Sequence, residues 1–458
     1  MAMEGMEALL KEAAERAARY LAELDARGVA ASEAAIARLA ELGGPLPEAP
    51  SDPAEVVRLL DEIGSPATQA TAGRRYFGFV TGGTLPAALG ASWLATAWDQ
   101  NAMLAVSSPV AAQLEVVALG WLREVLRLPL ECAGGFVTGA TMATFTCLAA
   151  ARHAVLARAG WDVEARGLFG APEVTVVVGE EVHATLIKAL GMLGLGRERV
   201  LRVPSDGQGR MRADAFPQLS GPAIVCLQAG NVNTGAFDPA AAIIPRAKAA
   251  GAWVHVDGAF GLWAAAARAR AHLLAGYDAA DSWTTDGHKW LNVPYDSGLA
   301  FVRDEAALRA AMAMGTAAPY LVEGASREPS HFTPEVSRRA RGVEVWAALR
   351  ALGRAGLAEL VERTCRYAAR LAEGLRAAGY AVLNEVVINQ ALVSFGDDET
   401  TRRVIAGIQR DGTCWCGGTV WQGRAAMRIS VSSWATTEAD VERSLAAILR
   451  VAGAVTGR

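Results

Sequence analysis

Residues 281–295 read D281-S-W-T-T-D-G-H-K-W-L-N-V-P-Y295. The stretch has the composition of a buried strand and turn, yet Lys289 stands in it between His288 and Trp290. Lysine is rarely fully buried, because a desolvated ammonium is unfavourable. Two interpretations stay open from this stretch alone. Either the lysine stem covers apolar surface while its head stays in water, or the amine is neutral and nucleophilic, as Schiff-base chemistry requires.

Short β-branched runs alternate with helical runs on both sides of this stretch, from Phe136 to Val302. We predict strands over 174–178, 223–227, 253–256 and 298–302, with helices over 184–193 and 240–250 between them. The alternation predicts an α/β fold with a mostly parallel central sheet and helices on both faces.

The 458 residues are too many for one simple domain. We expect an N-terminal helical segment over 1–75, a large domain over 76–345 and a smaller C-terminal α+β domain over 346–458. Strands over 390–395 and 427–431 would form the sheet of the C-terminal domain.

Composition argues against several function classes. The formal net charge is only −4, which gives no electrostatic attraction to nucleic acid or an anionic membrane. The N-terminus mixes acids and bases on a helical period, unlike a signal peptide, and no apolar run is long enough to span a membrane. Six scattered cysteines lack zinc spacing, since C414-x-C416 has no neighbouring histidine, so no metal site is expected. We therefore expect a reduced, cytoplasmic protein.

Three further features lie near the ends of predicted strands. The turn T138-G-A-T141 opens a helix, and its N–H groups and threonine hydroxyls suit a phosphate, although a simple N-capped helix is the alternative. His183 follows the strand ending near Val178 and is either a packing residue or a ring that stacks on an aromatic cofactor. Asp257 ends an apolar strand, where it is either a helix cap or the partner of a positive group.

Together these features match one chemistry. Pyridoxal 5'-phosphate needs a phosphate cradle, a ring stacker, a carboxylate for its pyridine nitrogen and a Schiff-base lysine. The combination predicts this cofactor and favours the nucleophilic interpretation of Lys289.

Three motifs then resemble those of the pyridoxal-phosphate-dependent group II amino-acid decarboxylases, which include glutamate and aromatic amino-acid decarboxylases. They are H255-V-D-G-A259, D286-G-H-K-W-L291 and S337-R-R-A-R-G-V-E-V-W346. The similarity runs from about Arg75 to past Trp346. It implies the fold of the pyridoxal-phosphate-dependent transferases (fold type I, as in aspartate aminotransferase) and an obligate homodimer with active sites at the subunit interface.

The resemblance also implies roles for individual residues. Lys289 resembles the Schiff-base lysine, Asp257 the partner of the pyridine nitrogen and His183 the ring-stacking histidine. Further cofactor contacts are implied for Thr138, Ala140, Thr141, Thr234 and His288. A substrate pocket, built partly by the neighbouring subunit, is implied for Phe79, Thr81, Thr84, Trp98 and Asn101.

Two departures from the family pattern stand out. Family members often have Asn-Pro before His-Lys, whereas this chain has Asp286-Gly287, and we assign Asp286 no phosphate role. A loop tyrosine that protonates the decarboxylated intermediate is replaced by Pro329. Tyr320 and His331 are the nearest candidates, and His331 has the better pKa for donating a proton near neutrality.

The predicted reaction is decarboxylation of an L-amino acid to its amine and carbon dioxide. The alternatives are an oxygen-dependent, aldehyde-forming decarboxylase or a transaminase on the same scaffold, or a catalytically silent dimer that binds the cofactor for regulation. No arginine stands in F77-G-F-V-T-G-G-T84 or W98-D-Q-N101 to hold a side-chain carboxylate, which favours a neutral or aromatic substrate.

Overall fold

The computed structural model describes residues 3–313 and 327–457. The chain divides into two compact units. The α/β unit comprises Thr84–Ala369 and Leu383–Ala391, and the terminal unit comprises Met1–Gly83, Arg370–Val382 and Leu392–Arg458.

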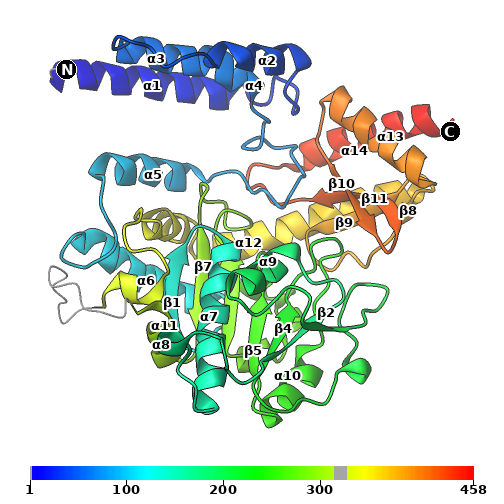
Figure 1. Ribbon diagram of the computed structural model, residues 1–458. Coiled ribbons are helices and arrows are strands. Elements are labelled where there is room, and N and C mark those ends of the chain that lie inside the picture. Colours follow the sequence, from blue (N-terminus) through cyan, green and yellow to red (C-terminus); the bar gives the residue numbers. More distant parts are fainter. Residues whose placement is uncertain (1–2, 314–326, 458) are drawn as a thin grey trace. The chain divides into compact units, whose positions relative to one another are not determined.

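The central sheet of the α/β unit has seven strands in the order β1-β7-β6-β5-β4-β2-β3 (Figure 1). The strands are β1 (Ala133–Val137), β2 (Thr175–Gly179), β3 (Val200–Val203), β4 (Ala223–Gln228), β5 (Trp253–Asp257), β6 (Ser282–Asp286) and β7 (Gly298–Val302). Only β7 runs antiparallel to its neighbours, β1 and β6, and the remaining pairs are parallel. The predicted mostly parallel sheet is confirmed, with β7 making it mixed.

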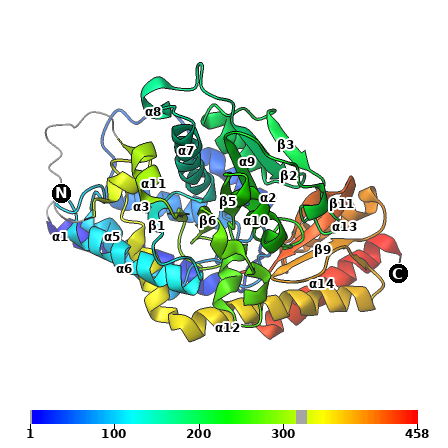
Figure 2. The ribbon, with the colours of Figure 1, turned by 90° about the horizontal axis from the view of Figure 1, so that it is seen from below.

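Helices cover both faces of this sheet (Figure 2). On one face α7 (Ala140–Arg158) packs with α9 (Ala184–Met192) and α11 (Glu305–Met312) over apolar residues of β2, β4 and β7. The connection from β4 to β5 runs through α10 (Ala240–Ala249), whose residues are absent from that apolar cluster. By length and composition alone, helix α7 could cross a membrane. However, 61% of its apolar stretch is buried inside the structure, as expected of a core helix.

The other helical segments of the α/β unit are α5 (Pro86–Trp98), α6 (Pro109–Val125), α8 (Val163–Arg166), η3 (Ala213–Ala215), η4 (Gly261–Ala266), η5 (Ala271–Leu274), η6 (Tyr277–Ala279) and η7 (Pro329–Phe332). The long α12 (Gly342–Ala377) begins in the α/β unit and ends in the terminal unit.

The terminal unit joins the two ends of the chain. Its helical segments are α1 (Met3–Glu23), α2 (Glu33–Arg38), η1 (Leu39–Leu42), α3 (Pro53–Leu59), η2 (Leu60–Gly64), α4 (Ser65–Ala67), α13 (Asp398–Asp411) and α14 (Glu438–Thr456). A four-stranded sheet has the order β10-β11-β9-β8, with β8 (Ala381–Val382), β9 (Gln390–Ser394), β10 (Gly417–Trp421) and β11 (Arg424–Ser430). This is the smaller sheet that the sequence predicted.

Contacts between distant residues explain why residues 1–83 group with the C-terminal sheet instead of forming a separate N-terminal segment. The Val29 N–H donates to the Gly412 carbonyl at 2.8 Å, and the Trp415 N–H donates to the Arg75 carbonyl at 3.0 Å. The Arg75 guanidinium also pairs with Asp440 at 3.1 Å while only 4% exposed. No local sequence pattern encodes these pairings.

The sequence missed strand β1, because glycines at 134 and 135 are unfavourable in strands and read as a turn. A Cβ built on Gly135 would lie 2.5 Å from the Phe332 carbonyl oxygen. The small residues therefore let η7 approach the edge strand.

Candidate active site

The carboxyl ends of the strands that carry the predicted residues meet at one edge of the sheet. Val137, at the end of β1, pairs with Gly298 of β7, and Gly298 pairs on its other side with Asp286 at the end of β6. Thr284, two residues earlier on β6, pairs with Asp257 at the end of β5. The register thus places Asp257, the start of α7 and the turn that carries Lys289 at the edge where doubly wound sheets bind ligands.

His183 belongs to the same edge. It follows β2, which pairs in parallel with β4. The His183 ring caps α9, because its Nδ1 accepts the Thr185 N–H at 3.3 Å and lies 2.7 Å from the Thr185 hydroxyl. Its half-buried ring is thereby fixed at the start of a helix that packs on α7. Stacking of this ring on a cofactor stays a prediction.

The predicted phosphate loop forms a close-packed cradle between β1 and α7. Thr138 and Thr141 are half-buried and Ala140 is buried. A Cβ on Gly139 would lie 3.2 Å from the His288 ring and 3.5 Å from the Asp286 carboxylate, so loop and lysine turn are in contact. A Cβ on Gly298 would lie 2.4 Å from the Gly139 backbone, which makes glycine necessary at the first residue of β7.

Lys289 lies mostly inside the α/β unit. Its side chain is 20% exposed, and its Nζ is 2.9 Å from Oδ2 of Asp286, which is 2% exposed. The lysine head therefore does not extend into solvent, as the first of the two interpretations required. It is held against a buried carboxylate.

His288 has a defined tautomer in its neutral form. The Ser297 N–H donates to Nδ1 at 3.0 Å, which leaves the proton on Nε2, 3.5 Å from Oδ1 of Asp286. Burial lowers the pKa of His288, and the nearby Asp286 carboxylate partly opposes this. The neutral ring accordingly presents an N–H donor towards the start of α7.

Two residues of this site were not predicted from the sequence. Asp286, which was given no role, contacts Lys289 and the start of α7. Tyr295, which is 59% exposed, stacks on His288 with ring centroids 4.3 Å apart. The i,i+3 spacing of Asp286 and Lys289 was the available signal for the first, and an aromatic residue soon after His-Lys was the signal for the second.

Asp257 is 7% exposed, and one of its oxygens accepts the Ala259 N–H at 3.2 Å. Within the described part of the chain, no lysine or arginine forms an ion pair with it. A nearly buried carboxylate without a cation fits a protonated ring nitrogen. With Lys289 and the glycine-lined cradle nearby, these residues fit pyridoxal 5'-phosphate.

Other predicted site residues have structural partners. Thr234 is fully buried, and its hydroxyl donates to the Gln208 carbonyl at 2.7 Å, which links its turn to the turn around residue 208. Asn101 donates to the Ser337 hydroxyl at 3.2 Å and accepts the Arg338 N–H at 3.3 Å. It thus fixes the start of the arginine-rich segment.

The remaining pocket residues are divided between the units. Thr84 precedes Leu85, whose N–H donates to the Asn292 carbonyl at 2.8 Å, so it lies beside the turn that carries Lys289. Trp98 ends α5 and is 41% exposed. Phe79 and Thr81 belong to the terminal unit.

His331 lies on η7, where its Nδ1 is 3.2 Å from the Arg309 guanidinium of α11. Its role as proton donor stays a prediction. The other candidate, Tyr320, lies outside the described residues.

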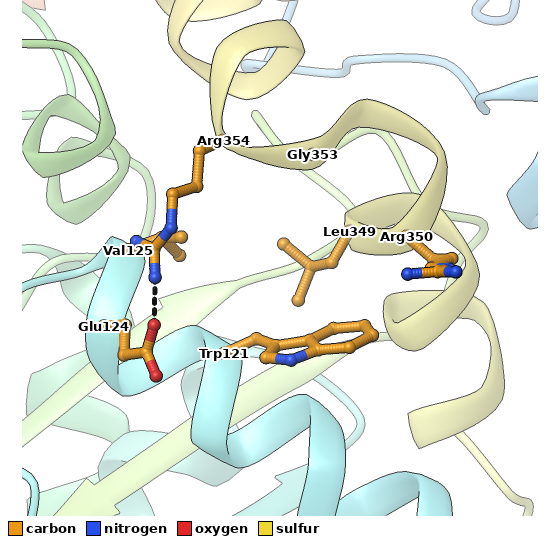
Figure 3. A pocket seen from close by; sticks show the side chains of 7 residues that line it. All are labelled: Trp121, Glu124, Val125, Leu349, Arg350, Gly353 and Arg354. Carbon is orange, nitrogen blue, oxygen red and sulfur yellow. Dashed lines mark hydrogen bonds and ion pairs between the residues drawn. The ribbon is translucent and has the colours of Figure 1, made fainter.

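A cavity of about 300 Å³ lies elsewhere in the α/β unit, between α6 and α12 (Figure 3). Trp121 and Leu349 face each other across it, and an Arg354–Glu124 ion pair lies at one side. Gly353, with a φ of 58°, interrupts α12 beside it. None of the predicted site residues lines this cavity, so it is separate from the cofactor residues.

Comparison with known proteins identifies the family. The model described as the pyridoxal-dependent decarboxylase conserved domain matches residues 48–396. The chain belongs to this family. Tryptophan decarboxylase 1 of Oryza sativa subsp. japonica is 28% identical to this decarboxylase over 401 residues, 78% of this chain and 76% of the relative. Phenylacetaldehyde synthase of Arabidopsis thaliana is 24% identical over 369 residues, 74% of each protein.

A crystal structure of Oryza sativa TDC with PLP and tryptamine superimposes with a TM-score of 0.90, covering 99% of each chain at 23% identity. The predicted fold is therefore confirmed. Membership of the family confirms a pyridoxal-phosphate-dependent carboxy-lyase.

Proposed function

We propose that this decarboxylase converts an L-amino acid to the corresponding amine and carbon dioxide, with Lys289 as its Schiff-base residue. The observation that carries the proposal is the convergence of Lys289, Asp257 and the start of α7 at one edge of the sheet. The lysine is mostly buried and the strand-end carboxylate lacks a cation in the described structure.

Each residue has a distinct task in this proposal. Lys289 holds the cofactor covalently, and the α7 amides with the Thr138 and Thr141 hydroxyls hold its phosphate. Asp257 keeps a proton on the ring nitrogen, and His183 covers a ring face. When bound, pyridoxal 5'-phosphate supplies an electron sink for the electrons of the breaking bond to the substrate carboxylate.

The substrate we propose is a neutral or aromatic L-amino acid. The segments 77–84 and 98–101 contain no arginine that could pair with a side-chain carboxylate. The tryptophan decarboxylase relative supports an aromatic substrate. Asn101 is proposed as a substrate contact that also positions Arg338, because its amide oxygen accepts the Arg338 N–H and its amide nitrogen has a second hydrogen to donate.

We also propose a homodimer. Helix α5 is strongly apolar, yet three of its large side chains remain exposed in the single chain: Trp93 at 46%, Leu94 at 56% and Trp98 at 41%. Such a surface is typical of a protein interface. Analytical ultracentrifugation of the wild-type protein and of Leu94→Glu tests this, and a wild-type monomer would contradict it.

Aldehyde formation is the second candidate reaction, and one observation favours it. Pro329 stands where the resemblance places the proton-donating tyrosine, and a proline has no proton to give. The phenylacetaldehyde synthase relative supports the same alternative.

One experiment separates these outcomes. The twenty amino acids are screened for carbon dioxide release, with amine, aldehyde, ammonia and peroxide measured in the same reactions. Amine without peroxide supports the leading proposal, whereas aldehyde with peroxide, dependent on oxygen, supports the alternative. Release of no carbon dioxide from any amino acid would contradict both.

A further inference from the structure

Asp286 is the residue of this site that the family resemblance leaves unexplained. Its side chain is 2% exposed and faces three groups assigned to the cofactor. Oδ1 accepts the Ala140 N–H at 2.5 Å and lies 3.5 Å from Nε2 of His288, and Oδ2 lies 2.9 Å from Nζ of Lys289. A single carboxylate thus engages the start of α7 and the lysine at the same time.

This arrangement stabilises the start of α7 and Lys289 through one side chain of the protein itself. The first amides of a helix have no partner within the helix, and the helix dipole favours an anion there. Asp286 supplies that anion from a residue 146 positions away in sequence. It also neutralises the Lys289 ammonium in a mostly buried place, where an unpaired charge would be unfavourable.

The same arrangement conflicts with phosphate binding. The Ala140 amide has one hydrogen to donate, and the cradle is where the phosphate is assigned. Two anions at one helix start repel each other. An asparagine of the same size could still accept the Ala140 N–H through its oxygen, but it would carry no negative charge and would add an N–H donor.

We propose that Asp286 is an internal competitor for the cofactor phosphate: its carboxylate occupies the first amide of α7 and must give it up when pyridoxal 5'-phosphate binds. This inference rests on the proposed function. It makes the cofactor of this chain more weakly held than it would be with a neutral residue at 286, and it makes the cofactor-free protein more stable.

The test uses Asp286→Asn and three compounds. Pyridoxal 5'-phosphate has both the phosphate and the aldehyde, pyridoxamine 5'-phosphate has the phosphate but cannot form a Schiff base with Lys289, and pyridoxal has the aldehyde alone. Dissociation constants are measured by fluorescence titration of the cofactor-free protein. We expect Asp286→Asn to bind pyridoxamine 5'-phosphate about 10- to 100-fold more tightly, from removal of a nearby like charge at an effective dielectric of about 20. Pyridoxal should gain less than pyridoxamine 5'-phosphate, because release of Lys289 from Asp286 affects its Schiff base but it has no phosphate to compete.

Asp281→Asn is the matched control. Asp281 is a buried carboxylate just before the other end of β6, where it pairs with Lys248 at 2.5 Å and accepts the Val254 N–H. The Asp281→Asn variant should bind all three compounds with the same dissociation constants as the wild-type protein. Asp286→Ser is the second variant, because serine is small and polar and carries no charge. It should show the same gain for pyridoxamine 5'-phosphate if Asp286→Asn does not fold.

Thermal unfolding supplies a readout independent of ligand spectra. Without cofactor, Asp286→Asn should melt below the wild-type protein, because α7 and Lys289 lose their charged partner. Adding pyridoxamine 5'-phosphate should raise its melting temperature by more than that of the wild type.

The outcomes are separable from those of the proposed function. Wild-type binding of pyridoxamine 5'-phosphate with no gain in either variant overturns the inference alone, as does an equal gain for pyridoxal. A wild-type protein that binds none of the three compounds overturns the proposed function and the inference with it.

Discussion

Gly298→Ala tests whether the contact between β7 and the loop before α7 maintains the cofactor cradle. An added methyl carbon would lie 2.4 Å from the Cα and carbonyl carbon of Gly139 and 2.6 Å from its nitrogen. Carbon atoms in contact normally lie about 3.5–4.0 Å apart, so a separation of about 1 Å must be created. Gly298 itself is held on both sides by pairing with Val137 and Asp286. The displacement therefore falls on the loop that presents the Ala140 amide.

Overpacking of this kind raises the free energy by about 1–3 kcal/mol. In the cofactor-free protein the loop can relieve the strain by moving. Cofactor binding requires the loop to return to its wild-type position, so the strain then weakens binding. We therefore expect the dissociation constant for pyridoxal 5'-phosphate to rise by about 5- to 150-fold. The assay is a titration of cofactor-free protein followed by absorbance, with circular dichroism to establish that the variant is folded.

Gly207→Ala is the control, because no atom beyond its two chain neighbours lies within 4 Å of its added methyl group. A folded Gly298→Ala protein that binds the cofactor within about twofold of wild type would refute the reasoning, since 1 kcal/mol already corresponds to about fivefold. It would show either that the loop does not hold the phosphate or that it moves without strain.

Further predictions concern the chemistry directly. Lys289→Ala should abolish turnover and the Schiff-base absorbance, and borohydride reduction of the wild type should label Lys289; a label on another lysine would contradict the assignment. Asp257→Asn should still bind cofactor but lower the turnover number by about 10²–10³-fold, as measured by carbon dioxide release, through loss of electrostatic stabilisation; near wild-type turnover would remove Asp257 as the partner of the ring nitrogen. His331→Phe should slow amine formation by about 10²–10⁴-fold, the usual contribution of a positioned proton donor, and shift the product towards aldehyde in air. If His331→Phe is unchanged and Tyr295→Phe shows this effect instead, the donor is the tyrosine that stacks on His288.

Local pattern was sufficient to predict much of this fold. The predicted strands over 223–227, 253–256 and 298–302 lie within β4, β5 and β7. This worked because strands buried on both faces are continuous apolar runs, whatever their order in the sheet. Strand β1 was not predicted, because its glycines are required by the close approach of η7. That requirement comes from tertiary packing and not from local sequence.

In the candidate site, too, some features could be predicted from local sequence and others could not. Lys289, Asp257 and His183 could be picked out from sequence, because each is a polar residue next to an apolar run and their combination matches one cofactor. The partners of site residues could not be predicted. Nothing local indicated that the Thr234 hydroxyl donates to the Gln208 carbonyl. No role was predicted for Asp286, while that carboxylate accepts an N–H from α7 and meets Lys289.

The sequence by itself therefore determined the class of fold and the cofactor, and it singled out Lys289, Asp257 and His183 as candidates for the chemistry. The tertiary structure alone decided that Asp286 and Ala140 meet, that Tyr295 covers His288 and that the two ends of the chain share one unit. The physical reason is that periodicity records which side chains face a core, whereas contacts across a hundred or more residues depend on strand order and register. Those are set by the packing of the whole sheet and its helices.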